Sequence, residues 1–215
     1  MTSCLNPNQA KCLTSILNQA LKDEAIPKMK IDEIKLLYEY NFWADRRILD
    51  TAGKVSEAQY TTITSFGCLR PTLIHLVDAM WAWRLSFQHR FVAPEYLTTA
   101  TSITPATMWE HDDLTESDLP TLETLKSRWQ EEETALRAYL AGLRDSDLNG
   151  LVRYLIPGNI LRERVLWHCL VHLVNHGTQH RSEAAALLTH WGHSPGGLDF
   201  TAFLNQHFNL PEPPE

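Results

Sequence analysis

The sequence has few of the features that mark membrane, secreted or nucleic-acid-binding proteins. No apolar run reaches the ~20 residues that a membrane span requires, and the N-terminal stretch MTSCLNPNQAKCL lacks the apolar centre of a signal peptide. The four cysteines, Cys4, Cys12, Cys68 and Cys169, form no CxxC pair, which argues against a disulfide framework and favours a reducing compartment. The formal net charge is −7 and no cluster of Lys and Arg interrupts it, which disfavours binding to a phosphate backbone. We therefore expect a cytoplasmic protein that binds neither a membrane nor nucleic acid.

Strand patterns are also scarce, whereas helical periodicity is strong. Apolar residues recur at three- and four-residue steps in four stretches, near residues 34–52, 71–87, 122–143 and 161–191. Only LVRYLI at 151–156, followed by Pro-Gly-Asn, suggests a short extended piece and a tight turn. The pattern predicts an all-α protein whose four long amphipathic helices form a four-helix bundle.

The domain organisation follows from where this periodicity begins and ends. Residues 1–28 are predicted to be an N-terminal extension, with one short helical segment that ends at Pro27. Residues 29–206 are predicted to form the bundle, and residues 207–215 a C-terminal tail. The chain shows no internal repeat and no low-complexity segment.

The stretch WHCLVHLVNHGTQH carries one histidine per helical turn, at His168, His172, His176 and His180. At about 100° per residue, the apolar stripe of this helix is centred about 110–120° from His168. By the same arithmetic His176 and His180 fall inside the stripe, at about 80° and 120°, whereas His172 lies on its flank and His168 points away. A polar ring in an apolar stripe needs a partner. The i, i+4 spacing of His176 and His180 suits a shared metal ion, as in the H-E-x-x-H zinc helix.

A third ligand would have to come from another helix. His75 is the only histidine in the amphipathic part of the second helix, and small residues surround it: Thr72, Ala79, Ala82 and Ser86. They leave room beside the ring for a metal and for a bound molecule. The sequence alone does not show that the two helices face each other, so hydrogen-bonded core histidines remain the alternative.

Three sequence stretches resemble the DinB/YfiT-like family of bundle proteins: LYEYNFWADRRIL, SFGCLRPTLIHLVDAMWAW and HLVNHGTQHRSEAAALL. The resemblance covers roughly residues 30–206, including the closing GHSPGGLDFTAFL. It implies a four-helix bundle with a mirror variant of the up-and-down topology, often dimeric. It also implies that His75, His176 and His180 bind one divalent metal, because the family carries a histidine in the second helix and an N-H-x-x-x-H pattern in the last. The sequence departs from the common family pattern at Ser182-Glu183.

The resemblance implies a metal-dependent enzyme. Characterised relatives are S-transferases that use bacillithiol or mycothiol, and a thiol-dependent maleylpyruvate isomerase. We therefore expect a transferase in which a low-molecular-weight thiol binds the metal as thiolate and attacks an electrophilic small-molecule substrate, with a homodimer as the assembly. Zinc and nickel are the first candidates for the metal, followed by iron and copper, since imidazole suits all four. Two acidic residues three positions after predicted ligands, Asp78 and Glu183, are candidates for orienting a ligand ring or reaching the edge of the site.

Two alternatives remain at this stage. One is a non-catalytic metal-binding bundle of the stress response. A substrate-sized pocket beside the metal would distinguish an enzyme from such a protein. The other is a structural or interaction module whose histidines belong to the core. Two carboxylates of the third helix, Glu132 and Glu133, raise the idea of a second metal, but the Glu-x-x-His pattern of bundle dimetal sites is absent.

Overall fold

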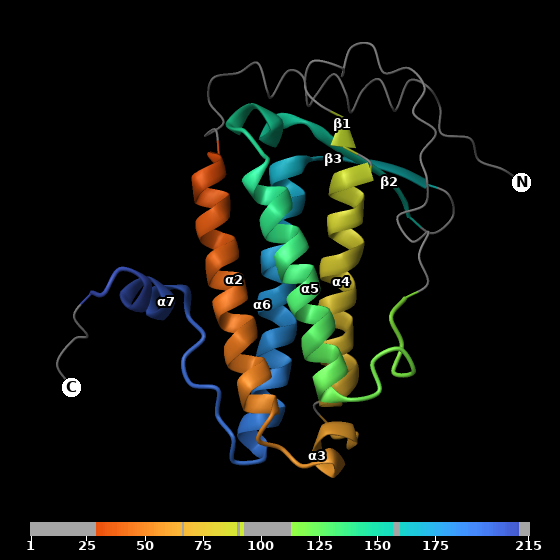
Figure 1. Ribbon diagram of the computed structural model, residues 1–215, viewed down its shortest axis with the longest axis vertical. Helices are drawn as coiled ribbons and strands as arrows, with labels where there is room; N and C mark the ends of the chain where they lie inside the picture. Colours follow the sequence, from red (N-terminus) through yellow and green to blue (C-terminus); the bar gives the residue numbers. More distant parts are fainter. Residues whose placement is uncertain (1–28, 66, 90, 93–112, 157–159, 211–215) are drawn as a thin grey trace, which may run out of the picture.

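The computed structural model describes residues 29–65, 67–89, 91–92, 113–156 and 160–210. Four long helices stand side by side and a small antiparallel sheet covers one end of them (Figure 1). The four long helices are α2 (Ile31–Ala52), α4 (Leu69–His89), α5 (Leu122–Ala141) and α6 (Leu166–His190). The shorter helical elements are α3 (Glu57–Thr61), the 3₁₀ helix η2 (Asp145–Asn149) and α7 (Phe200–His207). The prediction of an all-α four-helix bundle is confirmed; the N-terminal segment 1–28 lies outside the described residues.

Local sequence signals account for the ends of the long helices. In α2 the Glu33 carboxylate accepts a hydrogen bond from the backbone N–H of Lys30 at 2.9 Å, and Asp32 and Glu33 favour the positive end of the helix dipole. In α5 the hydroxyl of Thr121 accepts from the backbone N–H of Thr124 at 3.1 Å. Gly53 follows the last residue of α2. The sequence therefore determines these boundaries locally.

The helices do not simply alternate in direction. In Figure 1 α4 and α5 both run toward the sheet, and α2 and α6 both run away from it. The hydroxyl of Tyr38 on α2 donates to the carbonyl of Leu170 on α6 at 3.1 Å, and Arg84 on α4 pairs with Glu132 on α5 at 2.7 Å. Since α4 runs toward the sheet and α6 runs away from it, these two helices are antiparallel. The predicted histidines are on this antiparallel pair.

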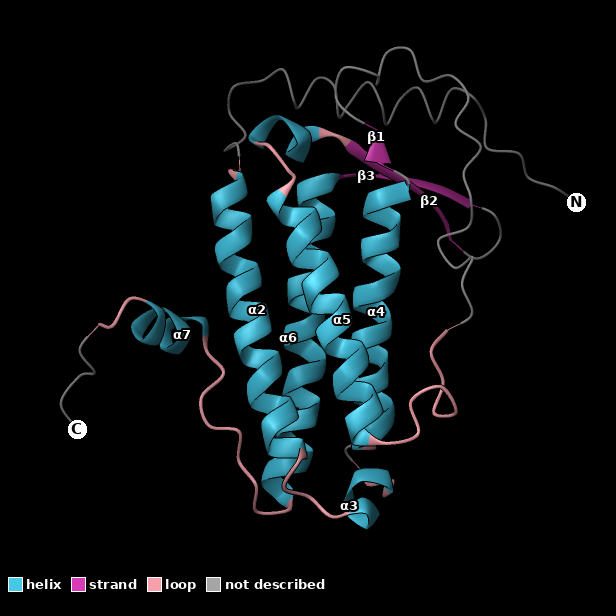
Figure 2. Cartoon of the chain, viewed as in Figure 1, coloured by secondary structure: helices cyan, strands magenta, loops and turns pink. Residues whose placement is uncertain are grey.

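A three-stranded antiparallel sheet in the order β1-β2-β3 joins the bundle at the end where α4 and α5 finish. It consists of β1 (Phe91–Val92), β2 (Leu151–Ile156) and β3 (Ile160–Val165), shown in magenta in Figure 2. The expected extended piece at 151–156 is confirmed as β2. The expectation that the last helix starts near Leu161 is wrong, because that segment pairs with β2 as β3, and α6 begins at Leu166. Apolar periodicity alone does not separate these two states when a strand leads straight into a helix.

The core lies between the four helices and follows the predicted stripes. Among the buried residues are Ile34, Tyr38, Ala44 and Ile48 of α2, and Leu125, Trp129, Leu136 and Leu140 of α5. α7 packs against α2, where the Phe203 ring lies 5.7 Å from the Trp43 ring and Phe200 meets Tyr40 edge to face at 5.3 Å. Within the described part of the chain, no helix has both the length and the apolar character to cross a membrane.

Candidate metal centre

Three histidines from two antiparallel helices converge halfway along the bundle. His75 comes from α4, and His176 and His180 come from successive turns of α6. One nitrogen of each ring lies within 4.8 Å of the others, and Nε2 of His75 is 3.1 Å from Nε2 of His176. The His180 ring lies 4.7 Å from the His75 ring and 4.5 Å from the His176 ring. The structure therefore brings together the three residues that the sequence singled out.

The two α6 histidines lie at the border of the buried helix face rather than at its centre. The buried residues of α6 include Leu170, Val174, Gly177 and Arg181, and they place the centre of that face further around the helix than the predicted stripe. His176 and His180 are only partly buried. The predicted stripe is displaced because it left out buried leucines and a valine further around the helix, as well as Gly177 and Arg181. At this border position each ring packs partly against the protein and is partly open to the adjoining space.

The surroundings of the site favour neutral imidazoles. Desolvation, then the His180 charge, lowers the pKa of His75. Desolvation, reinforced by the charges of His180 and His75, lowers the pKa of His176 to about 4. A neutral imidazole has a free lone pair on one nitrogen, which is the form that binds a metal. The short distances between the rings disfavour a proton on each of them, and they allow one cation to be shared by all three.

The separation of the His75 and His176 nitrogens suits two ligands of one divalent metal. Zn–N bonds of about 2.0–2.1 Å in tetrahedral geometry place two ligand nitrogens about 3.3 Å apart. The 3.1 Å between the Nε2 atoms of His75 and His176 is close to that value. The donor set of three imidazoles matches the preferences of zinc, nickel, iron and copper. These residues therefore fit the divalent ion that the family resemblance implies.

Glu183 holds the His180 ring in its orientation. Its Oε2 lies 2.8 Å from Nδ1 of His180, which directs the remaining nitrogen, Nε2, away from the carboxylate. Carboxylates commonly hold metal-binding histidines in this way. For Asp78, the described contact is a hydrogen bond from the backbone N–H of Leu114 at 3.0 Å, and its role in orienting His75 stays a prediction.

A cavity of about 450 Å³ adjoins the histidines. Its walls include the His75 and His176 rings, Trp83 of α4 and His172 of α6, whose rings meet edge to face at 5.2 Å. The remaining lining residues are Asp78, Ala79 and Asp113. The sequence reasoning set His172 aside as a flank residue. Its position one turn before His176 was the signal that it would face the same space.

The other sulfur and nitrogen donors near this helix do not join the cluster. His168 is exposed and its ring lies beside Trp167, at 4.0 Å. Cys169 is buried, and burial raises the pKa of its thiol to about 12, so it is protonated at neutral pH. This position is that of a cysteine that packs as a small apolar side chain.

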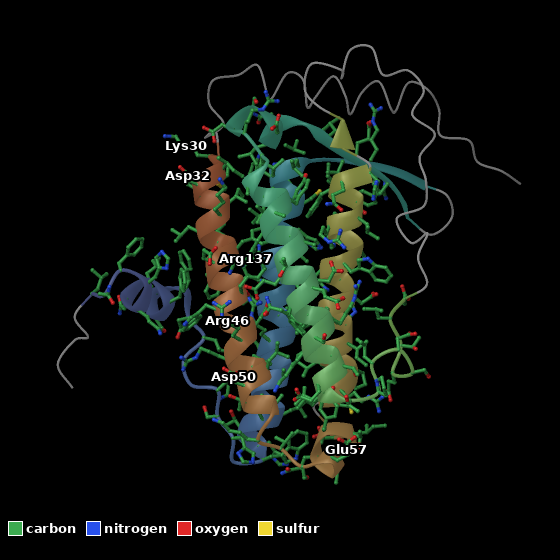
Figure 3. All side chains as sticks on the ribbon, viewed as in Figure 1. Lys30, Asp32, Arg46, Asp50, Glu57 and Arg137 are labelled. Carbon is green, nitrogen blue, oxygen red and sulfur yellow. The ribbon has the colours of Figure 1, made fainter. Side chains whose placement is uncertain are left out.

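The carboxylates of α5 serve ion pairs. Glu132 binds Arg84 at 2.7 Å and Arg128 at 2.7 Å, and Glu133 binds two further arginines. These two are Arg46 of α2 and Arg137 of α5, labelled in Figure 3. Arg84 and Arg46 thus join α5 to α4 and α2, and Arg128 and Arg137 complete the pairing from α5 itself. Both carboxylates are therefore engaged in ion pairs with arginines.

A second buried polar cluster, missed by the sequence reasoning, connects α6 to α2. The Arg181 side chain is 2% exposed, and its Nη1 donates to Asp45 Oδ1 and to Asn41 Oδ1, each at 2.7 Å. Its Nη2 donates to Thr178 at 3.1 Å, and Asn41 Nδ2 donates to Asp45 Oδ2 at 3.0 Å. Burial raises the pKa of the Asp45 carboxyl, and the Arg181 charge opposes that effect. The periodicity places Asn41 on the inner face of α2, but nothing in the sequence pairs it or Asp45 with Arg181, because that contact forms only once α2 packs against α6.

Comparison with known proteins supplies the family. A search of curated proteins finds no match to the chain. The sequence model of the DinB family matches residues 28–213, which is most of the chain and contains the bundle and all three converging histidines. The chain therefore belongs to the DinB family.

Proposed function

We propose that His75, His176 and His180 bind one divalent metal ion, with zinc or nickel as the first candidates. The observation that carries the proposal is the convergence of three imidazoles, one nitrogen from each within 4.8 Å of the others. His75 is exposed and the other two rings are partly buried, and three similar rings gain little from such crowding by themselves. A shared cation gives the arrangement a physical reason.

We propose further that the metal serves a reaction on a small molecule. The support is the cavity of about 450 Å³ that shares His75 and His176 with the site, within the ~300–1,000 Å³ typical of small-molecule pockets. When bound, a divalent ion held by three imidazoles lowers the pKa of a coordinated water or thiol. Trp83 and His172 would form the wall against which the substrate packs, and Glu183 would hold His180 in its orientation.

A low-molecular-weight thiol and an electrophile are the proposed substrates, as an S-transferase requires. This is the finer part of the proposal, and it rests on the family together with the cavity. The second candidate is a metal-binding protein without turnover. The cavity favours the enzyme, because a protein that only stores metal has no need of a substrate-sized space beside it.

Metal content tests the first step. The tag-free protein is exposed to zinc or nickel, dialysed and analysed by mass spectrometry of the elements, together with His176→Ala and His168→Ala. We expect about one metal per wild-type chain, none in His176→Ala and the wild-type amount in His168→Ala, which removes a histidine of the same helix outside the cluster. Wild-type protein that takes up neither ion would refute the proposal.

Turnover tests the second step. Loss of free thiol in the presence of a model electrophile is followed with metal-loaded and chelated protein. We expect a rate above background only with metal, and a return to background in His176→Ala. If metal-loaded protein is inactive with a broad panel of thiols and electrophiles, the non-catalytic alternative is favoured.

A further inference from the structure

One ring nitrogen of the histidine cluster faces the interior of the bundle. Nδ1 of His176 is buried and has no hydrogen-bond partner within the described part of the chain. An imidazole N–H left without an acceptor in the interior is costly, and metal-binding histidines normally give this proton to a carboxylate, a carbonyl or a water. The question is therefore which group accepts it.

The His176 ring borders a second, very small cavity on that inner side. Its volume is about 10 Å³, close to the ~10–15 Å³ that holds a single water molecule. The polar side chains that border it with His176 are Asn41, Asp45, Arg181 and Trp129, and all four are buried. Trp129 Nε1 is, like His176 Nδ1, buried without a hydrogen-bond partner among the described residues, so it is a second donor beside this cavity. The rest of the lining is mainly apolar. A water there would have two to four polar partners, as a buried water requires.

This polar cluster still has capacity to accept hydrogen bonds. Each Asp45 oxygen accepts one described bond, from Arg181 Nη1 at 2.7 Å or from Asn41 Nδ2 at 3.0 Å, and each has a second lone pair. Arg181 and the Asn41 amide nitrogen are donors. The Asp45 carboxylate is therefore the strongest acceptor on the inner side of His176.

Gly177 allows the cluster to lie this close to the helix that carries His176. A Cβ atom at position 177 would be 2.7 Å from Arg181 Nη1 and 2.8 Å from Asn41 Oδ1. A side chain at this position would push Arg181 and Asn41 away from the α6 backbone beside His176. Gly177 therefore allows these polar groups to pack directly against α6.

We propose that Asp45, held by Asn41 and Arg181, positions the His176 ring through one water molecule in the small cavity. The Nδ1–H of His176 donates to the water, and the water donates to the Asp45 carboxylate. This fixes the tautomer in which the His176 lone pair is on Nε2, the atom that faces Nε2 of His75. The inference rests on the proposed metal site. It makes Asp45 a positioning residue, which acts through the His176 ring and does not itself contact the metal.

The tautomer of His176 in metal-free protein is the first test. In protein labelled with ¹⁵N-histidine, the nitrogen shifts at neutral pH distinguish Nδ1–H from Nε2–H. We expect wild-type His176 to be almost entirely Nδ1–H, and Asp45→Asn to acquire a substantial Nε2–H population. The control is Glu132→Gln, which removes another buried carboxylate from an ion pair but lies outside the cavity lining; it should match wild type.

Metal affinity is the second readout. We expect Asp45→Asn to bind zinc about 10- to 100-fold more weakly than wild type, and Glu132→Gln to remain within about threefold. If Asp45→Asn does not fold, the double variant Asp45→Leu/Arg181→Met takes its place, because it removes the acceptor without leaving a buried charge. A folded variant that keeps the Nδ1–H tautomer and wild-type zinc affinity would overturn the inference. Absence of both zinc and nickel binding in wild type would refute the proposed function, and the tautomer populations would still decide whether Asp45 positions His176.

Discussion

Arg181 offers the sharpest prediction about what holds this bundle together. The side chains of Arg181 and Asp45 are 2% and 3% exposed, and the ion pair between them joins α6 to α2 inside the bundle. Arg181→Met keeps most of the side-chain volume but leaves the Asp45 carboxylate buried without its counter-charge. Breaking a buried pair in this way costs about 3–5 kcal/mol of the free energy of unfolding. For a domain of this size, that corresponds to a fall in Tm of about 6–20 °C.

The measurement is urea and thermal unfolding of metal-free protein, followed by circular dichroism, so that metal binding does not contribute. The matched control is Arg46→Met, since Arg46 also pairs with a carboxylate of another helix but is 52% exposed; it should cost at most about 1 kcal/mol. Asp45→Leu/Arg181→Met should recover most of the lost stability, because no charge is left unpaired. If Arg181→Met costs no more than Arg46→Met, the Arg181–Asp45 pair is not a main determinant of stability.

Three further predictions concern α6. Zinc or nickel at about 100 times its Kd should raise the free energy of unfolding of the wild type by about 2.7 kcal/mol, and a chelator should reverse this stabilisation. A Tm shift of equal size in His176→Ala would show that the ion binds elsewhere. Gly177→Ala should lower the urea midpoint although alanine favours helix by about 1 kcal/mol, because its Cβ would meet Arg181 Nη1 at 2.7 Å; an unchanged or higher midpoint would show that the cluster can move. Glu183→Gln should weaken metal binding about 10-fold, as measured by calorimetry. This is the lower end of the effect of removing the partner of a metal-binding histidine, because Glu183 is 44% exposed. Wild-type affinity in that variant would mean that His180 needs no carboxylate.

The sequence identified the histidines that the structure brings together because their main signal is local. The i, i+4 spacing of His176 and His180 places both rings on one side of any helix that contains them. His75 was harder, since its choice depended on being the one histidine in the amphipathic part of its helix and on the family pattern. The inner partners, Asn41 and Asp45, could not be predicted, because their relation to His176 exists only once α2 lies against α6.

By itself, the sequence determined the four helices, most of their ends and the histidine spacing, because periodicity, caps and turn residues act over a few positions. It misplaced the start of α6, since strand β3 is defined by its pairing with β2 and not by its own residues. Only the tertiary structure decided that α4 lies antiparallel to α6, which sets His75 opposite His176 at 3.1 Å. It also decided that an arginine, Arg181, belongs to the core. Both facts depend on partners about 100 residues or more away in the chain, and interactions at that distance leave no periodic trace in a single sequence.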